Sequence, residues 1–198
     1  MTNNIIIHQL IACVLFFNIV WIFENKTDKF KCSNILALWC SILLCIFTFV
    51  YIFTKDTYYV TLTIAIFLSY LILELIYGSI YFREHMHLIT TYIHHIVYIL
   101  LVLYLLYTYD MDKLSVLSLS FLVEIPTILL NLKRYYNIKS KLFNLAYGIL
   151  FLIFRVLLNI CIIYYVYNLD NLLLSCSIIA LFAHIKVLYD WYIKYNKN

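Results

Sequence analysis

The stretch LFNLAYGILFLIFRVLLNICIIYYVY, residues 142–167, decides the fold of this chain. It carries one charged side chain, Arg155, and is long enough to cross about 30 Å of hydrocarbon as an α-helix rising about 1.5 Å per residue. Comparable apolar runs cover residues 5–23, 35–53, 58–82, 88–107, 114–132 and 172–193. Continuous apolar runs lack the alternation of barrel strands, and a backbone in lipid must satisfy its own hydrogen bonds. The sequence therefore predicts an all-α, polytopic transmembrane bundle of about seven helices.

The composition supports the same class. Apolar residues make up 66% of the 198 residues, charged residues only 12%, and the mean hydropathy is +0.94. A soluble domain of this size would have about a quarter of its residues charged. We therefore predict a single transmembrane domain over residues 1–198. The formal net charge of +4 is explained by membrane topology and gives no reason to expect a nucleic-acid partner.

Lysine and arginine are distributed unevenly between the connections. With a non-cytoplasmic N-terminus and a cytoplasmic C-terminus, the opposite side receives only Lys55 and Lys113. The cytoplasmic side then receives Lys26, Lys29, Lys31, Arg83, Lys133, Arg134, Lys139, Lys141, Lys186, Lys194 and Lys197. Because cytoplasmic loops carry the excess of these residues, this orientation is the predicted one.

Ionisable side chains inside the apolar runs are the candidate functional residues, since such groups are costly in lipid. At about 1.5 Å per residue, four of them are expected roughly 9 to 12 Å below the cytoplasmic helix ends. These four are Glu74, His94, His95 and Glu124, and His184 is expected near the same level. Arg155 is expected about two turns deeper. The shared depth predicts a polar cavity that opens toward the cytoplasm.

Pro126, the only proline, lies two residues after Glu124. Proline lacks a backbone N–H, so we expect the carbonyl of Leu122 to be left free and the helix to kink beside the acid.

Three stretches resemble the TLC-domain membrane proteins, a family that includes the ceramide synthases and smaller lipid-related proteins. They are IHHIV at 93–97, EIPTILLNLK at 124–133 and FLIFR at 151–155, and the resemblance covers about residues 35–193. Ceramide synthases carry a further His-Asp and a second Asp where this chain has Phe121, Leu122 and Val123. The chain is therefore more similar to the smaller branch. The resemblance implies a role in lipid metabolism or membrane lipid homeostasis at the endoplasmic reticulum or a related endomembrane, with Thr127, Asn131 and Arg155 as part of its pattern.

The residue types suggest acyl transfer. A neutral imidazole in a low-dielectric cavity takes a proton from an amine or hydroxyl, or is itself acylated. Adjacent histidines on a helix point about 100° apart, so His94 and His95 are expected to play different roles. One acts as base or transient acyl carrier and the other orients a carboxylate or the substrate, with Glu124 or Glu74 as the orienting acid. Thr127, Asn131, Arg155 and His184 are the expected substrate-binding residues or charge partners.

The partners that this hypothesis implies are membrane lipids and an acyl-CoA as substrate, with no cofactor and no metal. Six histidines are too few for the histidine boxes of a membrane di-iron oxidase. Two other classes stay open. The histidines of a non-catalytic lipid-binding or regulatory protein would serve as neutral hydrogen-bonding groups between helices. A transporter or receptor would use the same acids and histidines as a relay.

Overall fold

A computed structural model describes residues 2–24, 29–81, 83–86, 92–108 and 110–197, and every regular element within these ranges is helical. The first four α-helices are α1 (Thr2–Glu24), α2 (Lys29–Thr54), α3 (Thr57–Tyr81) and α4 (His94–Thr108), with the short 3-10 turn η1 (Arg83–His85) between α3 and α4. The remaining elements are α5 (Met111–Ser120), η3 (Phe121–Glu124), α6 (Ile125–Tyr136), α7 (Lys141–Leu150), η4 (Phe151–Leu157), α8 (Leu158–Val166) and α9 (Asn171–Lys197).

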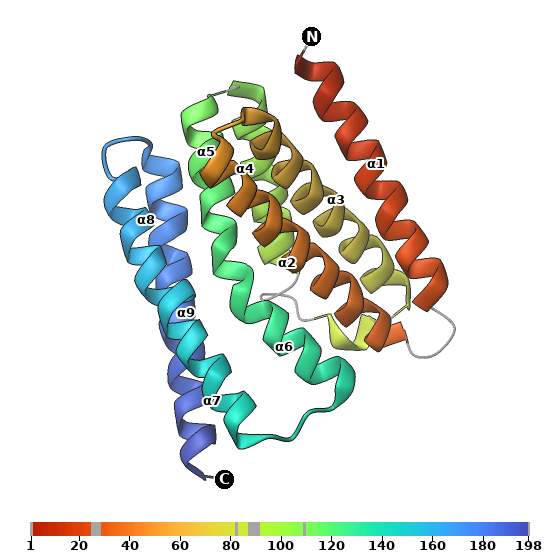
Figure 1. Cartoon of the computed structure of the whole chain (residues 1–198), viewed down its shortest axis with the longest axis vertical. Coiled ribbons are helices and arrows are strands. Elements are labelled where there is room, and N and C mark those ends of the chain that lie inside the picture. The colour runs from red at the N-terminus through yellow and green to blue at the C-terminus, as the bar shows by residue number, and fades with distance from the viewer. Residues whose placement is uncertain (1, 25–28, 82, 87–91, 109, 198) are drawn as a thin grey trace.

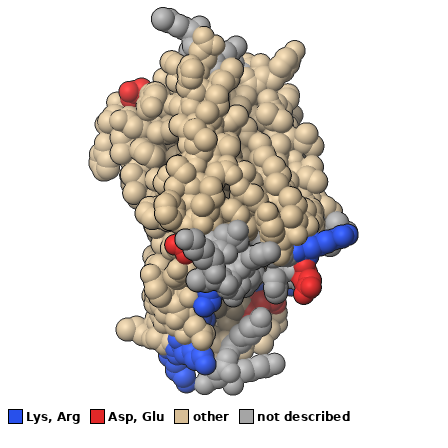
Figure 2. Space-filling model, turned by 90° about the vertical axis from the view of Figure 1, so that its right-hand side faces the viewer, with Lys and Arg blue, Asp and Glu red and all other residues tan. Residues whose placement is uncertain are grey.

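The predicted all-α membrane architecture is confirmed. Within the described ranges, six helical rods are long and apolar enough to span a membrane, because α5, η3 and α6 run on as one rod and α7, η4 and α8 as another. The expected helix at 88–107 corresponds to the shorter α4, and residues 88–91 lie outside the described part of the chain. Figure 2 shows one face whose upper part is almost free of charged side chains, while Lys and Arg gather at its lower end. The chain is thus a multi-pass membrane protein.

The core forms around α3. Of its apolar stretch 61% is buried, against 6% for α9, which places α3 at the centre of the bundle and α9 at its edge. α3 contacts α1, α2, α4 and α5, and Figure 1 shows α7, α8 and α9 lying together on the far side of the α5–α6 rod from α1. The stacked rings of Trp21 and Tyr77, 4.2 Å apart, hold α1 against α3. Ser118 joins the interior helices, because its hydroxyl pairs with Thr63 at 2.9 Å and its carbonyl accepts from Thr48 at 3.1 Å.

Both long rods are distorted near their middle. In the first, the four residues before Ile125 form the 3-10 turn η3, and Ile125 N–H donates to the Leu122 carbonyl. The expectation that Pro126 leaves this carbonyl free is therefore wrong, because tightening the turn moves the donor one residue closer along the chain. In the second rod, residues 151–157 form a π-helical segment, η4, of a kind that often occurs at functional sites.

One lysine fastens two turns at the end of the bundle opposite the C-terminus. Lys113 Nζ lies 2.8 Å from Asp170 Oδ2 and 3.4 Å from Asp110 Oδ2, so it joins the turn before α5 to the turn before α9. Partial burial raises the pKa of the Asp170 carboxyl. Hydrogen bonds from Lys113 and from the Leu173 and Leu172 N–H groups, together with the charge of Lys113, outweigh burial and leave this pKa below its ordinary value.

Candidate functional site

His95 and Glu74 form the first polar pair, between α4 and α3. His95 Nε2 lies 2.8 Å from Glu74 Oε2, and the two side chains are only 9% and 15% exposed. A carboxylate accepts hydrogen bonds, so the proton lies on Nε2 of His95. Ser33 on α2 donates to the other oxygen of Glu74 at 3.3 Å, and Tyr70, one turn before Glu74 on α3, is a further hydrogen-bonding neighbour. The carboxylate is thus held by groups from three helices.

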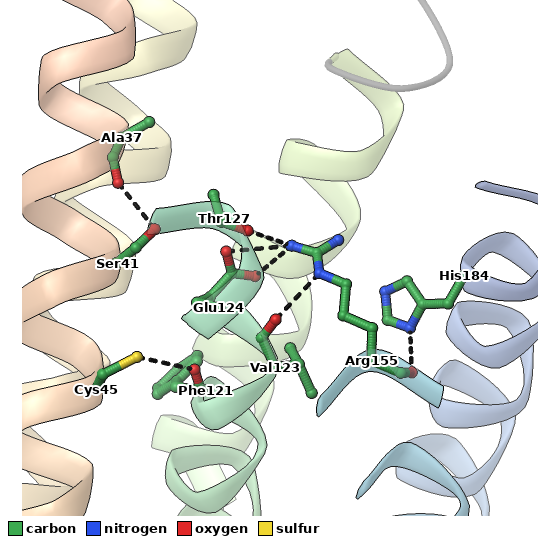
Figure 3. Close-up of polar contacts among 9 residues, drawn as sticks. All are labelled: Ala37, Ser41, Cys45, Phe121, Val123, Glu124, Thr127, Arg155 and His184. Carbon is green, nitrogen blue, oxygen red and sulfur yellow. Dashed lines mark hydrogen bonds and ion pairs between the residues drawn. The ribbon is translucent and has the colours of Figure 1, made fainter. Parts of the chain in front are cut away.

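Arg155 is the centre of the second polar cluster, and Figure 3 shows it reaching from η4 toward η3 and α6. Its Nη2 lies 3.2 Å from Glu124 Oε1 and 2.6 Å from Thr127 Oγ1, and its Nε donates to the Val123 carbonyl at 3.0 Å. The guanidinium also lies over the Phe151 ring, 5.5 Å from the centroid. The Arg155 and Glu124 side chains are 22% and 24% exposed, so the ion pair is neither sealed in the core nor free in solvent.

His184 on α9 contacts the backbone of the same π-helical segment. Its Nδ1 lies 2.8 Å from the Arg155 carbonyl oxygen, and its ring meets the Phe151 ring edge-on. A carbonyl oxygen only accepts, so Nδ1 carries the proton. In a neutral imidazole the lone pair is then on Nε2.

The two clusters face one pocket of about 130 Å³, which we call the histidine pocket. It is lined by Ala37, Cys40, Ser41, Leu44, Phe67, Tyr70, Leu71, His94, His95, Glu124, Thr127 and Arg155. His94 is exposed and its ring lies 4.7 Å from that of Tyr98 and 5.6 Å from that of His95. Neither nitrogen of His94 hydrogen-bonds to any residue in the described ranges, whereas His95 is held by Glu74.

A second pocket measures about 60 Å³, and we call it the α8–α9 pocket. Tyr98 and Val123 lie on its wall, one helical turn from His94 and one residue from Glu124 respectively. Most of its lining is apolar, and Asn159, Ser177 and His184 are among its polar residues.

The predicted site residues are mostly brought together. The histidine pocket is lined by His94, His95, Glu124, Thr127 and Arg155. Glu74 hydrogen-bonds to His95 in this lining, and His184 contacts the Arg155 carbonyl. Asn131 does not belong to this set: it is 3% exposed on α6, and its Nδ2 has no hydrogen-bond partner in the described part of the chain.

The count from helix ends places Arg155 two turns beyond Glu124 and does not predict their contact, but the two side chains form an ion pair. The predicted depths are counted from the cytoplasmic end of each helix, but Figure 1 shows that the helices end at different heights, with α7 and α9 extending below α1, α2 and α3.

Sequence reasoning missed Ser33, Ser41 and Tyr70. Tyr70 had a usable signal, because it lies four residues before Glu74 and therefore on the same helix face. Ser33 and Ser41 gave none, since small polar residues are common between membrane helices.

No group of three or more His, Cys, Asp or Glu side chains in the described ranges is arranged to hold a metal ion. No protein-family model, no curated protein and no solved structure matches the chain. A function therefore has to be inferred from the side chains in and around the histidine pocket.

Proposed function

We propose that the chain is a membrane-embedded acyltransferase of lipid metabolism, which moves an acyl group from a cytosolic thioester such as acyl-CoA to a membrane lipid. The proposal depends on one observation above all: His94 presents two ring nitrogens without a hydrogen-bond partner among the described residues, beside a His95 that Glu74 holds. One imidazole is oriented and the adjacent one is available to react. This is the division of roles that two histidines about 100° apart on a helix permit.

The histidine pocket is large enough for the reacting end of a substrate but not for a whole acyl-CoA or lipid molecule. Pockets that enclose a drug-sized molecule measure about 300–1,000 Å³, and this pocket measures about 130 Å³. It suits the thioester carbonyl and its immediate neighbours. The apolar remainder of both substrates then lies along the exposed apolar surface of the helices, which include Ile96, Leu100 and Leu103 on α4.

The transfer takes place in two balanced steps. A His94 nitrogen attacks the thioester carbonyl carbon, the carbon–sulfur bond breaks, and the thiolate leaves with the proton that His94 gives up. The hydroxyl or amine of the lipid acceptor then attacks the acyl-imidazole, the carbon–nitrogen bond breaks, and His94 recovers a proton from the acceptor. The His95–Glu74 pair orients the helix end that carries His94.

Orientation, organelle and family are part of the same proposal. An N-terminus outside the cytoplasm and a C-terminus within it place the thioester on the side where Lys and Arg gather in Figure 2. The resemblance of residues 35–193 to the smaller TLC-domain proteins supports residence in the endoplasmic reticulum or a related endomembrane.

The test uses the full chain purified in lipid nanodiscs and incubated with radiolabelled palmitoyl-CoA. We expect a hydroxylamine-sensitive label on the wild type, none on His94→Ala, and a weaker label on His95→Ala. His8→Ala, which removes an exposed histidine near the N-terminus, is the matched control and should label like the wild type.

Equal labelling of His94→Ala and the wild type overturns the acyl-carrier role. If no variant labels, lipidomics of cells expressing the wild type or the His94→Ala, His95→Ala double variant decides between the remaining classes. A changed lipid profile without labelling identifies a non-catalytic lipid-binding or regulatory protein. An unchanged profile favours the transporter or receptor.

A further inference from the structure

Two polar atoms near the site have no hydrogen-bond partner among the described residues, and one is a donor and the other an acceptor. Arg155 uses Nη2 and Nε for its four hydrogen bonds, and its Nη1 donates to no residue in the described ranges. His184 uses Nδ1, and its Nε2 accepts from none of them. Neither atom is among the fully buried polar atoms that lack a partner, and each of the two side chains lines a pocket.

The two atoms lie on the facing sides of the Arg155 and His184 side chains. In Figure 3, Nη1 of Arg155 lies on the side of the guanidinium away from Glu124, and the Nε2 edge of the His184 ring faces the Arg155 side chain. They do not hydrogen-bond to each other, although His184 lies within electrostatic range of both Arg155 and Glu124. Arg155 lines the histidine pocket, His184 lines the α8–α9 pocket, and His184 Nδ1 hydrogen-bonds to the Arg155 carbonyl, so this pair lies between the two pockets.

A donor and an acceptor at one place recognise a group that accepts and donates at once. Nη1 offers N–H donors only, and Nε2 of the tautomer fixed by the Arg155 carbonyl offers a lone pair only. A hydroxyl satisfies both, because its oxygen accepts from Arg155 while its proton is donated to His184. A protonated amine fails, since it has no lone pair for Arg155.

We propose that Arg155 Nη1 and His184 Nε2 bind the hydroxyl of an alcohol-bearing lipid, with the first carbons of that lipid at the mostly apolar α8–α9 pocket and the rest of its chain along the exposed apolar surface of the helices. This inference rests on the proposed function and specifies its acceptor. The hydroxyl oxygen bonds to the acyl carbon on His94, the carbon–nitrogen bond breaks, and the hydroxyl proton passes to His184 and then to the leaving imidazole of His94. An ester and the neutral enzyme result.

The His184→Asn variant separates this role from a structural one. An asparagine amide in the place of Nδ1 still donates to the Arg155 carbonyl, but it has no atom in the place of Nε2. His184→Phe keeps a ring against Phe151 and removes both nitrogens. If His184 only fastens η4 to α9, His184→Asn should bind hexadecanol and release the acyl group like the wild type, and His184→Phe should not.

Binding is measured first, because it does not require turnover. Hexadecanol is titrated into nanodisc-embedded wild type and His184→Asn, and the rise in Tm gives the affinity. We expect His184→Asn to bind hexadecanol about three- to tenfold more weakly, which is the effect of one lost hydrogen bond. Hexadecylamine should raise the Tm of both proteins equally. Equal hexadecanol affinity in both proteins overturns the hydroxyl site, whether or not the chain transfers acyl groups.

Turnover is measured second, with palmitoyl-CoA as donor and hexadecanol as acceptor. We expect His184→Asn to form the hydroxylamine-sensitive label at the wild-type rate but to release it as hexadecyl palmitate at least about a hundredfold more slowly, the low end for loss of a general base. Slowing of both steps to the same extent makes His184 structural and overturns the proposal. Absence of label on the wild type counts against the proposed function, and the binding result still stands.

Discussion

Replacing Arg155 with methionine tests whether the guanidinium fastens the two distorted rods to each other. The side chain contacts the Val123 carbonyl, the Glu124 carboxylate and the Thr127 hydroxyl. Hydrogen bonds between membrane helices contribute about 0.6 kcal/mol each on average and at most about 1.7 kcal/mol. Three such contacts place the loss near 2 kcal/mol.

The charge left on Glu124 adds to this loss. Removing one partner of a fully buried pair costs about 3–5 kcal/mol, but here about a quarter of each side chain is exposed, so the added cost is reduced. We expect Arg155→Met to lower the free energy of unfolding by about 2–3 kcal/mol in total. Glu124→Leu with Arg155→Met removes both charges and should be less destabilising than the two single changes added together, with a coupling of about 1–2 kcal/mol.

The assay is reversible unfolding of the purified chain in mixed micelles, for both single variants and the double variant. Arg134→Met, which removes an exposed arginine on α6, is the control and should change stability by less than about 0.5 kcal/mol. Additive single effects, with no coupling between positions 124 and 155, would show that the ion pair does not hold the rods together.

Three further predictions concern other parts of the chain. The pKa of Asp170 lies below its ordinary value of 3.8, so the ionised carboxylate stabilises the fold above that pH, and this stabilisation is lost as the pH falls through the lower folded-state pKa. Acid unfolding followed by circular dichroism should therefore show a flatter profile below about pH 4 for Asp170→Asn than for the wild type. A Cβ at Gly148 would overlap the Trp191 ring, so Gly148→Ala should destabilise the chain by about 1–3 kcal/mol, and adding Trp191→Leu should restore part of the loss in thermal unfolding. Asn131→Leu should leave acyl transfer unchanged and raise stability by about 1 kcal/mol, because it removes a buried amide nitrogen that has no partner among the described residues; a loss of transfer would return Asn131 to the site.

Hydropathy predicted the spanning helices well because lipid imposes the same length and apolar character on every one of them. Residues 142–167 and 172–193 correspond closely to the rod of α7, η4 and α8 and to the apolar stretch of α9. The distortions at η3 and η4 were harder to predict. A proline predicts some irregularity, but whether the turn tightens or opens depends on the neighbours that accept its freed groups.

Side-chain pairing was only partly predictable for a related reason. Counting residues from helix ends correctly brought Glu74 and His95 to one level, because α3 and α4 are adjacent. The same count did not predict the contact of Arg155 with Glu124, because the helix of Arg155 ends at a different height. Which histidine is held and which is available also required coordinates, since the 100° between neighbours says that they differ but not which one faces the acid.

The Arg155–Glu124 contact has a consequence for biogenesis. An arginine near the middle of a spanning segment opposes insertion by about 2.5–3.5 kcal/mol on translocon scales. The ribosome completes the segment with Glu124 before it completes the one with Arg155, so the acid is already in the bilayer when the arginine arrives. Chains truncated before residue 141 would leave that acid without its cation and expose it to quality control, so insertion of the rod formed by α7, η4 and α8 is the step at which newly made protein becomes acceptable to the membrane.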